Sequence, residues 1–134
     1  LLSYGLKPRK SLTIELPEIP KKYFSFFLRG YFDGDGCVNV YSRGADGKTI
    51  QVVFVSGSRV FLEKLAKEIT SVTGGNLKKI IYQSNAHRLA YKAKQAVCVC
   101  DLMYKGLDLA PYLKRKHKIY ADYLSWRAKP FLRP

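Results

Sequence analysis

Two acidic residues, Asp33 and Asp35, lie in the segment FFLRGYFDGDG, which spans residues 26–36. Aromatic, aliphatic and small residues surround them. A carboxylate beside apolar surface costs free energy unless it is paired, hydrated or bound to a cation. The segment therefore indicates either two turn and helix-capping acids or a site that binds a metal ion. For an arbitrary D-G-D-G segment, the first interpretation is the default.

A helix is predicted to position these acids, from about Pro20 to Asp35. Phe24, Leu28 and Tyr31 recur at the spacing of one helical face. The opposite, polar side is expected to hold Lys22, Ser25, Arg29 and Asp33. The acids thus come at the end of an amphipathic helix.

Two glycines, Gly30 and Gly34, form a third sector of this helix, flanked by Tyr23 and Phe27. Glycine inside a helix costs about 1 kcal/mol relative to alanine. Two glycines four residues apart on one face therefore need a reason. The close approach of another backbone supplies one, so this sector is predicted to be a second packing face.

The rest of the chain is predicted to fold as two hairpins separated by helices. Strands are expected at 37–43 and 48–56, around GADG, and at 77–83 and 88–99, around SNAH. Helices are expected at 59–72 and at 116–128, and the first of them stops at Gly74-Gly75. A further short helix is expected after Asp101, which would cap it. The order is αββαββα, an α+β domain with one antiparallel four-stranded sheet. Residues 20–134 are interpreted as a single domain, and residues 1–19 as an N-terminal arm.

The charge of the chain points to a polyanionic partner. Lys and Arg number 24 against 10 acids, a formal net charge of +14, which is typical of nucleic-acid-binding proteins. Basic and polar residues gather on one face of the predicted sheet. The candidates are Asn39, Tyr41 and Arg43 on the first strand and Arg88, Lys92 and Lys94 on the fourth. A solvated outer face is the alternative interpretation.

The third strand has two alternative phases. Either Lys79, Ile81 and Gln83 face outward, or Lys78, Ile80 and Tyr82 do. The first phase adds Lys79 to the candidate DNA-binding residues. A two-stranded ribbon with such side chains suits the major groove of double-stranded DNA.

The cysteines and the hydropathy pattern bear on localisation. Cys37, Cys98 and Cys100 lack the spacing of a disulfide framework. Cys98 and Cys100 are expected on one face of a strand, where they fill space or, alternatively, bind a metal. No apolar run approaches about 20 residues, and no signal peptide is evident. We expect no membrane partner and an intracellular, reducing compartment, cytoplasm or organelle, with no secretion.

The segment LRGYFDGDG, residues 28–36, resembles the signature of the LAGLIDADG homing endonucleases. PRKSLTIELPEIP before it and PYLKRKHK before the last helix are similar to the family as well. The resemblance covers most of the chain. It implies the αββαββα fold, with a curved antiparallel four-stranded sheet that binds DNA as a saddle, and a role in intron or intein mobility.

The resemblance also implies a site. Asp35 would bind Mg²⁺ with the backbone carbonyl of Gly34, Mn²⁺ or Ca²⁺ substituting in binding, and both DNA strands would be hydrolysed. Lys116 would be the catalytic basic residue, with Lys114 and Lys118 as rivals. Two motif helices would pack in a homodimer through Tyr23, Phe27, Gly30 and Gly34. Asp33 is then expected to be structural or an interface acid.

Several features depart from the family pattern or leave alternatives. Arg29 occupies a position that is usually small, so helix packing is looser there or Arg29 points outward. The family often has a polar residue at the end of the second strand, where this chain has VSGS, residues 55–58. The residue that would order a water molecule is therefore left unassigned. Because the chain has one motif and the reaction needs two, we expect either a homodimer or the second half of a two-motif protein. The chain begins with Leu, which favours an origin inside a longer protein. The other functional alternatives are a non-catalytic DNA-binding regulator and an intron RNA maturase.

Overall fold

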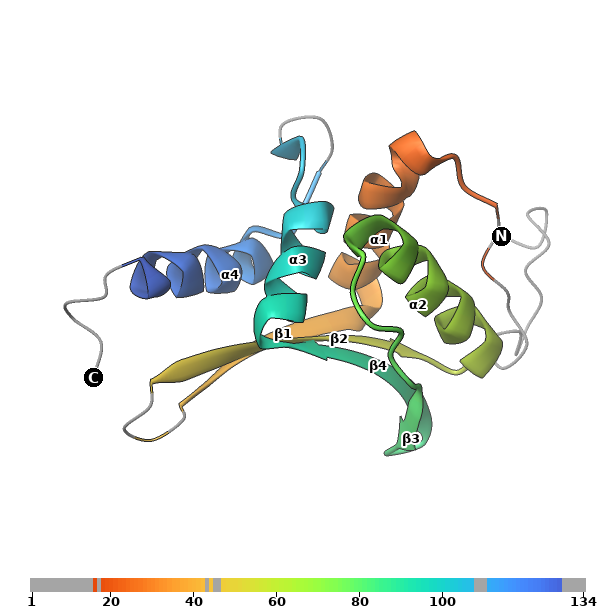
Figure 1. The fold of residues 1–134 in the computed structure, drawn as a ribbon, viewed down its shortest axis with the longest axis horizontal. Helices are drawn as coiled ribbons and strands as arrows, with labels where there is room; N and C mark the ends of the chain where they lie inside the picture. Colours follow the sequence, from red (N-terminus) through yellow and green to blue (C-terminus); the bar gives the residue numbers. More distant parts are fainter. Residues whose placement is uncertain (1–15, 17, 43, 45–46, 108–110, 129–134) are drawn as a thin grey trace.

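Helices in this chain cover one face of a curved sheet and leave the other face uncovered (Figure 1). The computed structural model describes residues 16, 18–42, 44, 47–107 and 111–128. In Figure 1 both ends of the sheet bend away from the helices, so the uncovered face is concave. The predicted curved, four-stranded antiparallel sheet in an α+β fold is therefore confirmed.

The first helix, α1 (Lys21–Asp35), follows Pro20 and ends where Gly36 takes up an extended conformation. Phe24, Leu28 and Phe32 point to the core and are buried. The helix leads directly into the hairpin β1 (Gly36–Ser42) and β2 (Lys48–Ser56). The acids at the end of α1 are therefore joined without a linker to the first strand.

The second helix, α2 (Arg59–Thr73), has sequence-encoded ends. The Ser58 hydroxyl accepts a hydrogen bond from the Phe61 N–H at 3.1 Å, and Gly74 adopts a left-handed φ of 76°. Both are common helix-terminating devices. The predicted bounds of α2 are thus confirmed to within one residue.

The second hairpin consists of β3 (Ile81–Gln83) and β4 (Ala86–Lys92). All strand pairs are antiparallel, in the order β1-β2-β4-β3. The inward-facing side chains are buried against the helices: Val38, Ile50, Val52, Phe54, Leu89 and Tyr91. Ile81 and Gln83 pair with the outward-facing residues Arg88 and Ala86, which resolves the phase of the third strand.

The predicted strand at 88–99 is wrong in its second half. The strand ends at Lys92, Ala93 adopts a φ of 53°, and α3 (Ala93–Met103) begins there. Asp101 therefore lies inside a helix and does not cap one. Cys98 and Cys100 lie on this helix, exposed and buried respectively, so they share no strand face.

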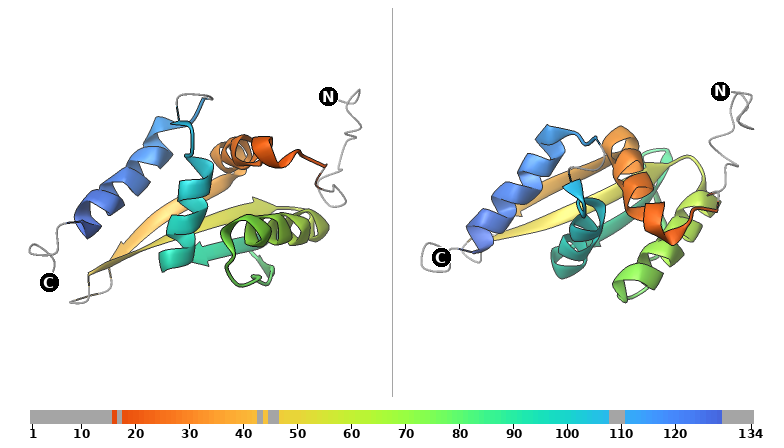
Figure 2. Two further views of the ribbon diagram at one scale, coloured as in Figure 1. Left: turned by 45° about the horizontal axis from the view of Figure 1, so that its top comes forward. Right: turned by 90° about the horizontal axis from the view of Figure 1, so that it is seen from above.

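The last helix, α4 (Lys114–Arg127), runs along the β1 side of the sheet (Figure 2). The third strand was predicted too long, since residues 77–80 precede β3 without strand pairing. Within the described residues, no helix is both long and apolar enough to cross a membrane. The N-terminal arm and the end of the predicted domain fall largely outside the described residues.

Candidate functional site

The C-terminal end of α1 is held by Lys116 of α4. The buried ammonium donates hydrogen bonds to three backbone carbonyls: Phe32 at 2.7 Å, Asp33 at 3.1 Å and Gly36 at 2.6 Å. The last carbonyls of a helix lack partners within it and carry the negative end of its dipole. Lys116 satisfies both requirements and therefore acts as a cap for α1.

Burial lowers the pKa of the Lys116 ammonium, and the nearby charge of Asp33 works in the opposite direction. Arg115 lowers the pKa further, and Asp35 raises it. Desolvation is the leading cause because the side chain is only 7% exposed. The three carbonyl acceptors stabilise the charged form at this position.

Asp33 completes the junction from the other side. Its Oδ2 accepts a hydrogen bond from the backbone N–H of Leu113 at 2.9 Å, at the start of α4. An acid at a helix start satisfies an unpaired N–H and suits the positive end of the dipole. The end of α1 and the start of α4 are thus joined reciprocally, in agreement with the structural role expected for Asp33.

Asp35, two residues along, is exposed at the very end of α1. In the described part of the chain the ion pairs are Arg59–Glu63 and Lys118–Asp122, so Asp35 is not ion-paired there. The Gly34 carbonyl is not among the three acceptors of Lys116. A carboxylate and a carbonyl, both hard oxygen ligands for Mg²⁺, come from neighbouring exposed residues.

One chain does not assemble a full metal-ligand set from its described residues. No group of three or more His, Cys, Asp or Glu side chains gathers among them. Hard divalent cations bind six or more oxygens, several from water or substrate. Asp35 and Gly34 would therefore need ligands from outside this chain.

The side of α1 that carries Gly30 and Gly34 faces open space. A Cβ atom built on either glycine meets nothing within 4 Å. Tyr23 on the same side is 50% exposed, and Phe27 is half-buried. The four residues predicted for a helix interface thus form one exposed side, with the small residues nearest Asp35.

Arg29 is a correction to the sequence prediction, since it neither faces solvent nor loosens packing. It is 0% exposed, and its Nε donates to the Met103 carbonyl at 2.8 Å. Its Nη2 donates to the carbonyls of Lys105 at 2.9 Å and Gly106 at 3.4 Å. The guanidinium therefore caps the C-terminal end of α3, as Lys116 caps α1.

The outward face of the sheet brings together part of the predicted nucleic-acid surface. Asn39 of β1 and Lys92 of β4 are exposed there, on either side of Gln51 of β2. Tyr41 is exposed, and its hydroxyl donates to the Gln51 side-chain carbonyl. Arg88 faces the same way and donates from Nε to the Gln83 carbonyl at 3.3 Å.

Three predicted DNA-binding residues do not lie on these strands as described. Lys94 belongs to α3, and Lys79 precedes β3; both are exposed. Arg43 lies outside the described residues. Gln51 is a further polar residue of this face that the sequence prediction did not include. It lies opposite Asn39 in the hairpin, so the two side chains share a face.

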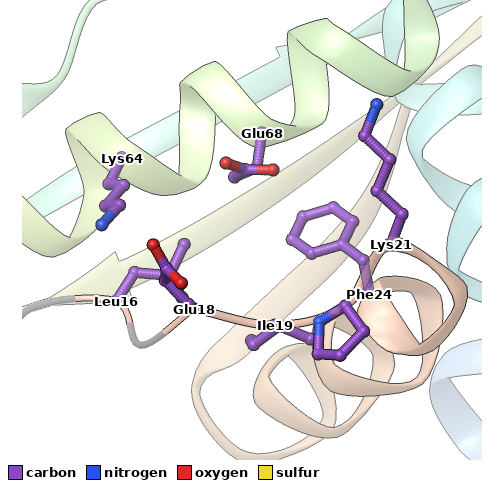
Figure 3. A pocket seen from close by; sticks show the side chains of 8 residues that line it. Leu16, Glu18, Ile19, Lys21, Phe24, Lys64 and Glu68 are labelled. Atoms are coloured by element: carbon purple, nitrogen blue, oxygen red, sulfur yellow. The ribbon is translucent and has the colours of Figure 1, made fainter.

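A hollow of about 480 Å³ lies at the opposite end of α1 (Figure 3). Phe24, Leu16 and Ile19 supply apolar lining, and the charged lining residues are Glu18, Lys21, Lys64 and Glu68. Two acids and two lysines nearly cancel in charge. This hollow is separated from Asp35 by the length of α1, so it is not part of the candidate site.

Residues 25–70, from α1 to α2, match the family model described as LAGLIDADG-like domain. The match supports an assignment of residues 25–70 to the LAGLIDADG family. The matched stretch contains most of α1 and the first hairpin, but not the α4 residue Lys116 that caps α1. Lys116 and Arg29 therefore link the matched stretch to the rest of the chain.

One curated protein shares local similarity with this chain. It is the probable translation initiation factor IF-2 of Thermococcus kodakarensis, 40% identical over 62 residues. The match covers 43% of this chain and only 5% of that protein. No solved structure gives a significant match.

Proposed function

We propose that this chain is a site-specific, Mg²⁺-dependent double-strand DNA endonuclease that acts as a dimer of single-motif subunits. The observation that carries the proposal is the exposed Asp35 carboxylate at the end of α1, beside an open, glycine-lined side of the same helix.

Pairing through α1 explains the composition of its exposed side. Gly30 and Gly34 would allow two helix backbones to approach closely near their C-terminal ends, whereas Tyr23 and Phe27 are bulkier and lie nearer the N-terminal ends. Two such helices would converge toward Asp35. The pair of carboxylates would repel each other unless a cation lay between them.

The residues at this end fit a divalent cation. Asp35 would bind it through its carboxylate and Gly34 through its backbone carbonyl, and the negative end of the α1 dipole favours positive charge there. Bound Mg²⁺ would supply Lewis-acid polarisation of the phosphate and a more acidic water. A second copy would bring the ligands that one chain lacks.

Lys116 is included in the proposed site through its position and charge. Its hydrogen bonds to the Phe32, Asp33 and Gly36 carbonyls hold the backbone that carries Asp35. Its ammonium adds positive charge where a scissile phosphate would lie. The predicted catalytic role of Lys116 remains a prediction; of its rivals, Lys118 pairs with Asp122 at 2.8 Å and Lys114 is exposed.

DNA would bind the concave, uncovered face of the sheet. A net charge of +14 favours association with phosphates. Asn39, Tyr41, Arg88 and Lys92 line this face with donors and positive charge. Its curvature and lack of covering helices suit a duplex (Figure 1).

The experiment is cleavage of a randomised duplex DNA library with Mg²⁺, followed by sequencing of the ends. Asp35→Asn should still bind the library but lose cleavage by about 1,000-fold or more, since it removes a metal-binding charge. Asp122→Asn makes the same substitution at an exposed position of α4 and is the matched control, so this variant should cut normally. Equal cleavage by the Asp35 variant would reject Asp35 as the metal-binding residue. Binding without cleavage by the unmodified chain would reject the endonuclease and favour a DNA-binding regulator.

A further inference from the structure

One row of polar side chains crosses three strands on the outward face of the sheet, beside the polar pair of Tyr41 and Thr49. Asn39 pairs with Gln51, and Gln51 pairs with Lys92. Residues directly opposite one another on neighbouring strands have side chains on the same face. The row therefore presents two amides and an ammonium side by side.

The neighbouring row has little hydrogen-bonding capacity. Cys37 pairs with Val53, and Val53 pairs with Ala90. These side chains offer methyl groups and a thiol, which is a weak donor. Direct hydrogen bonds to base edges from the centre of the sheet therefore come from the row of Asn39, Gln51 and Lys92, whereas Arg88 lies beyond the apolar row.

Gln51 is the member of the row whose amide orientation is set by a neighbour. The Tyr41 hydroxyl donates to Oε1 of Gln51, which leaves both Nε2 hydrogens as donors. Asn39 has only a contact from Nδ2 to the Cys37 sulfur at 3.9 Å. Lys92 carries a point charge without such directionality.

We propose that Gln51 is a specificity-determining residue and that Tyr41 is its positioning residue. This inference rests on the proposed DNA binding by the sheet. With Oε1 engaged by Tyr41, Gln51 presents donors to the major groove, where guanine offers two acceptors, O6 and N7. A glutamine that could rotate would instead suit adenine N6 and N7, which need one acceptor and one donor.

The test is repeated selection of bound sequences from a randomised duplex DNA library in Ca²⁺, with sequencing of the enriched pool. The unmodified chain should enrich guanine at one position per half-site. Gln51→Glu replaces the donor with an acceptor, so the preference at that position should move to cytosine by roughly 10-fold. Tyr41→Phe releases the amide, so adenine should become accepted there.

Two matched controls separate this effect from general loss of charge or hydroxyl. Gln83→Glu makes the same substitution on the edge strand, and Tyr82→Phe removes another exposed tyrosine hydroxyl. Neither should alter the base preferred at the Gln51 position. Melting curves check that all four variants fold.

The outcomes distinguish this inference from the proposed function. If the unmodified chain enriches a sequence but Gln51→Glu and Tyr41→Phe enrich the same one at every position, Gln51 does not read bases and this inference is overturned alone. If the unmodified chain enriches no sequence, site-specific DNA recognition is overturned together with it. If Gln51→Glu shifts the preference toward cytosine but Tyr41→Phe changes nothing, Gln51 remains a specificity-determining residue and Tyr41 is not its positioning residue.

Discussion

The two sides of α1 differ in what they contact. On the inner side, Leu28, Arg29 and Phe32 are fully buried, and Arg29 is hydrogen-bonded to the end of α3. On the outer side, Gly30 and Gly34 are exposed and meet nothing within 4 Å. The inner side is therefore accounted for by the fold of this chain, whereas the outer side is not.

This difference separates the residues that the stability of one chain explains from those that it does not explain. Exposed glycines weaken a helix by about 1 kcal/mol each relative to alanine. They gain no contact from the part of the chain that the structure describes, so the stability of that part gives no reason for them. A partner helix would give such a reason, so substitutions on the two sides of α1 should have different effects.

The largest effect is expected from enlarging the outer side. Gly34→Leu should weaken dimer formation and DNA cleavage by about 100-fold or more, because the leucine separates the paired backbones. The monomer should remain folded, since the position is open. Sedimentation velocity and cleavage assays measure both, with Ser71→Leu on exposed α2 as the control. Unchanged association would remove the outer side of α1 from the dimer interface.

On the inner side, Arg29→Met should lower the free energy of unfolding by about 3 kcal/mol. The methionine fills part of the space but leaves the carbonyls of Met103 and Lys105 without their donor. Urea unfolding measures the change, and Lys22→Met on the exposed surface of the same helix should stay within about 0.5 kcal/mol. Equal effects of the two substitutions would contradict the cap assigned to Arg29.

The tyrosines packed beside the inner side predict a loss of stability at alkaline pH. Burial raises the pKa of Tyr31 to about 12 from 10.0, so the folded state keeps a proton that the unfolded state loses between these values. Because Tyr31 is only half-buried and solvent screens part of the effect, it contributes on the order of 1 kcal/mol, which is present below pH 10 and lost as pH rises toward 12. Burial raises the pKa of Tyr91, Tyr104 and Tyr120 in the same direction.

Lys116 acts in the opposite sense, because its lowered pKa makes its contribution rise with pH up to about 10.5. Unfolding curves at a series of pH values, with tyrosine absorbance as a second signal, measure the balance. The decline should be shallower in Tyr31→Phe and unaltered in the exposed control Tyr82→Phe. A stability that stays constant from pH 10 to 12 would be inconsistent with the buried tyrosines.

The smallest effects come from adding one methyl group to different glycines. Gly30→Ala should stabilise the monomer by up to about 1 kcal/mol, because its Cβ enters open space on a helix. Gly36→Ala should destabilise it by about 1–3 kcal/mol, since its Cβ would lie 2.4 Å from the Phe32 ring. Thermal unfolding compares them, and effects of the same sign would break the distinction between the two positions.

Much of the fold could be predicted because local patterns agree with tertiary contacts. Phe24 and Leu28 recur at helical spacing and are buried, and Ser58 and Gly74 mark the ends of α2. The strand at 48–56 was predicted with its observed ends. In these segments the side that looks apolar is the side that packs.

The error at α3 arose where two periodicities overlap. Arg88 to Lys94 alternate between polar and apolar residues, and the valines that follow favour strands. The buried residues of α3 nevertheless include Ala96, Cys100 and Met103, which are spaced by four and three residues. The break at Ala93, with its φ of 53°, is the feature that local sequence did not signal.

The residues of the candidate site also fall into those that the sequence predicts and those that it does not. Asp35 could be predicted because the motif places it at a helix end, which is where it lies. The caps made by Arg29 and Lys116 could not, because their acceptors lie 74 and 84 residues away along the chain. An arginine in a polar sector looks solvent-exposed until its partner carbonyls are known.

The junction between α1 and α4 also sets an order of events during synthesis. The motif helix emerges from the ribosome long before Lys116 does, and contacts between distant parts of a chain form late. A nascent chain that ends before α4 contains the whole acidic segment but no ammonium at its Phe32 carbonyl. The geometry at Asp35 is therefore completed only after α4 has been synthesised and has docked, about 80 residues later than the acidic segment itself.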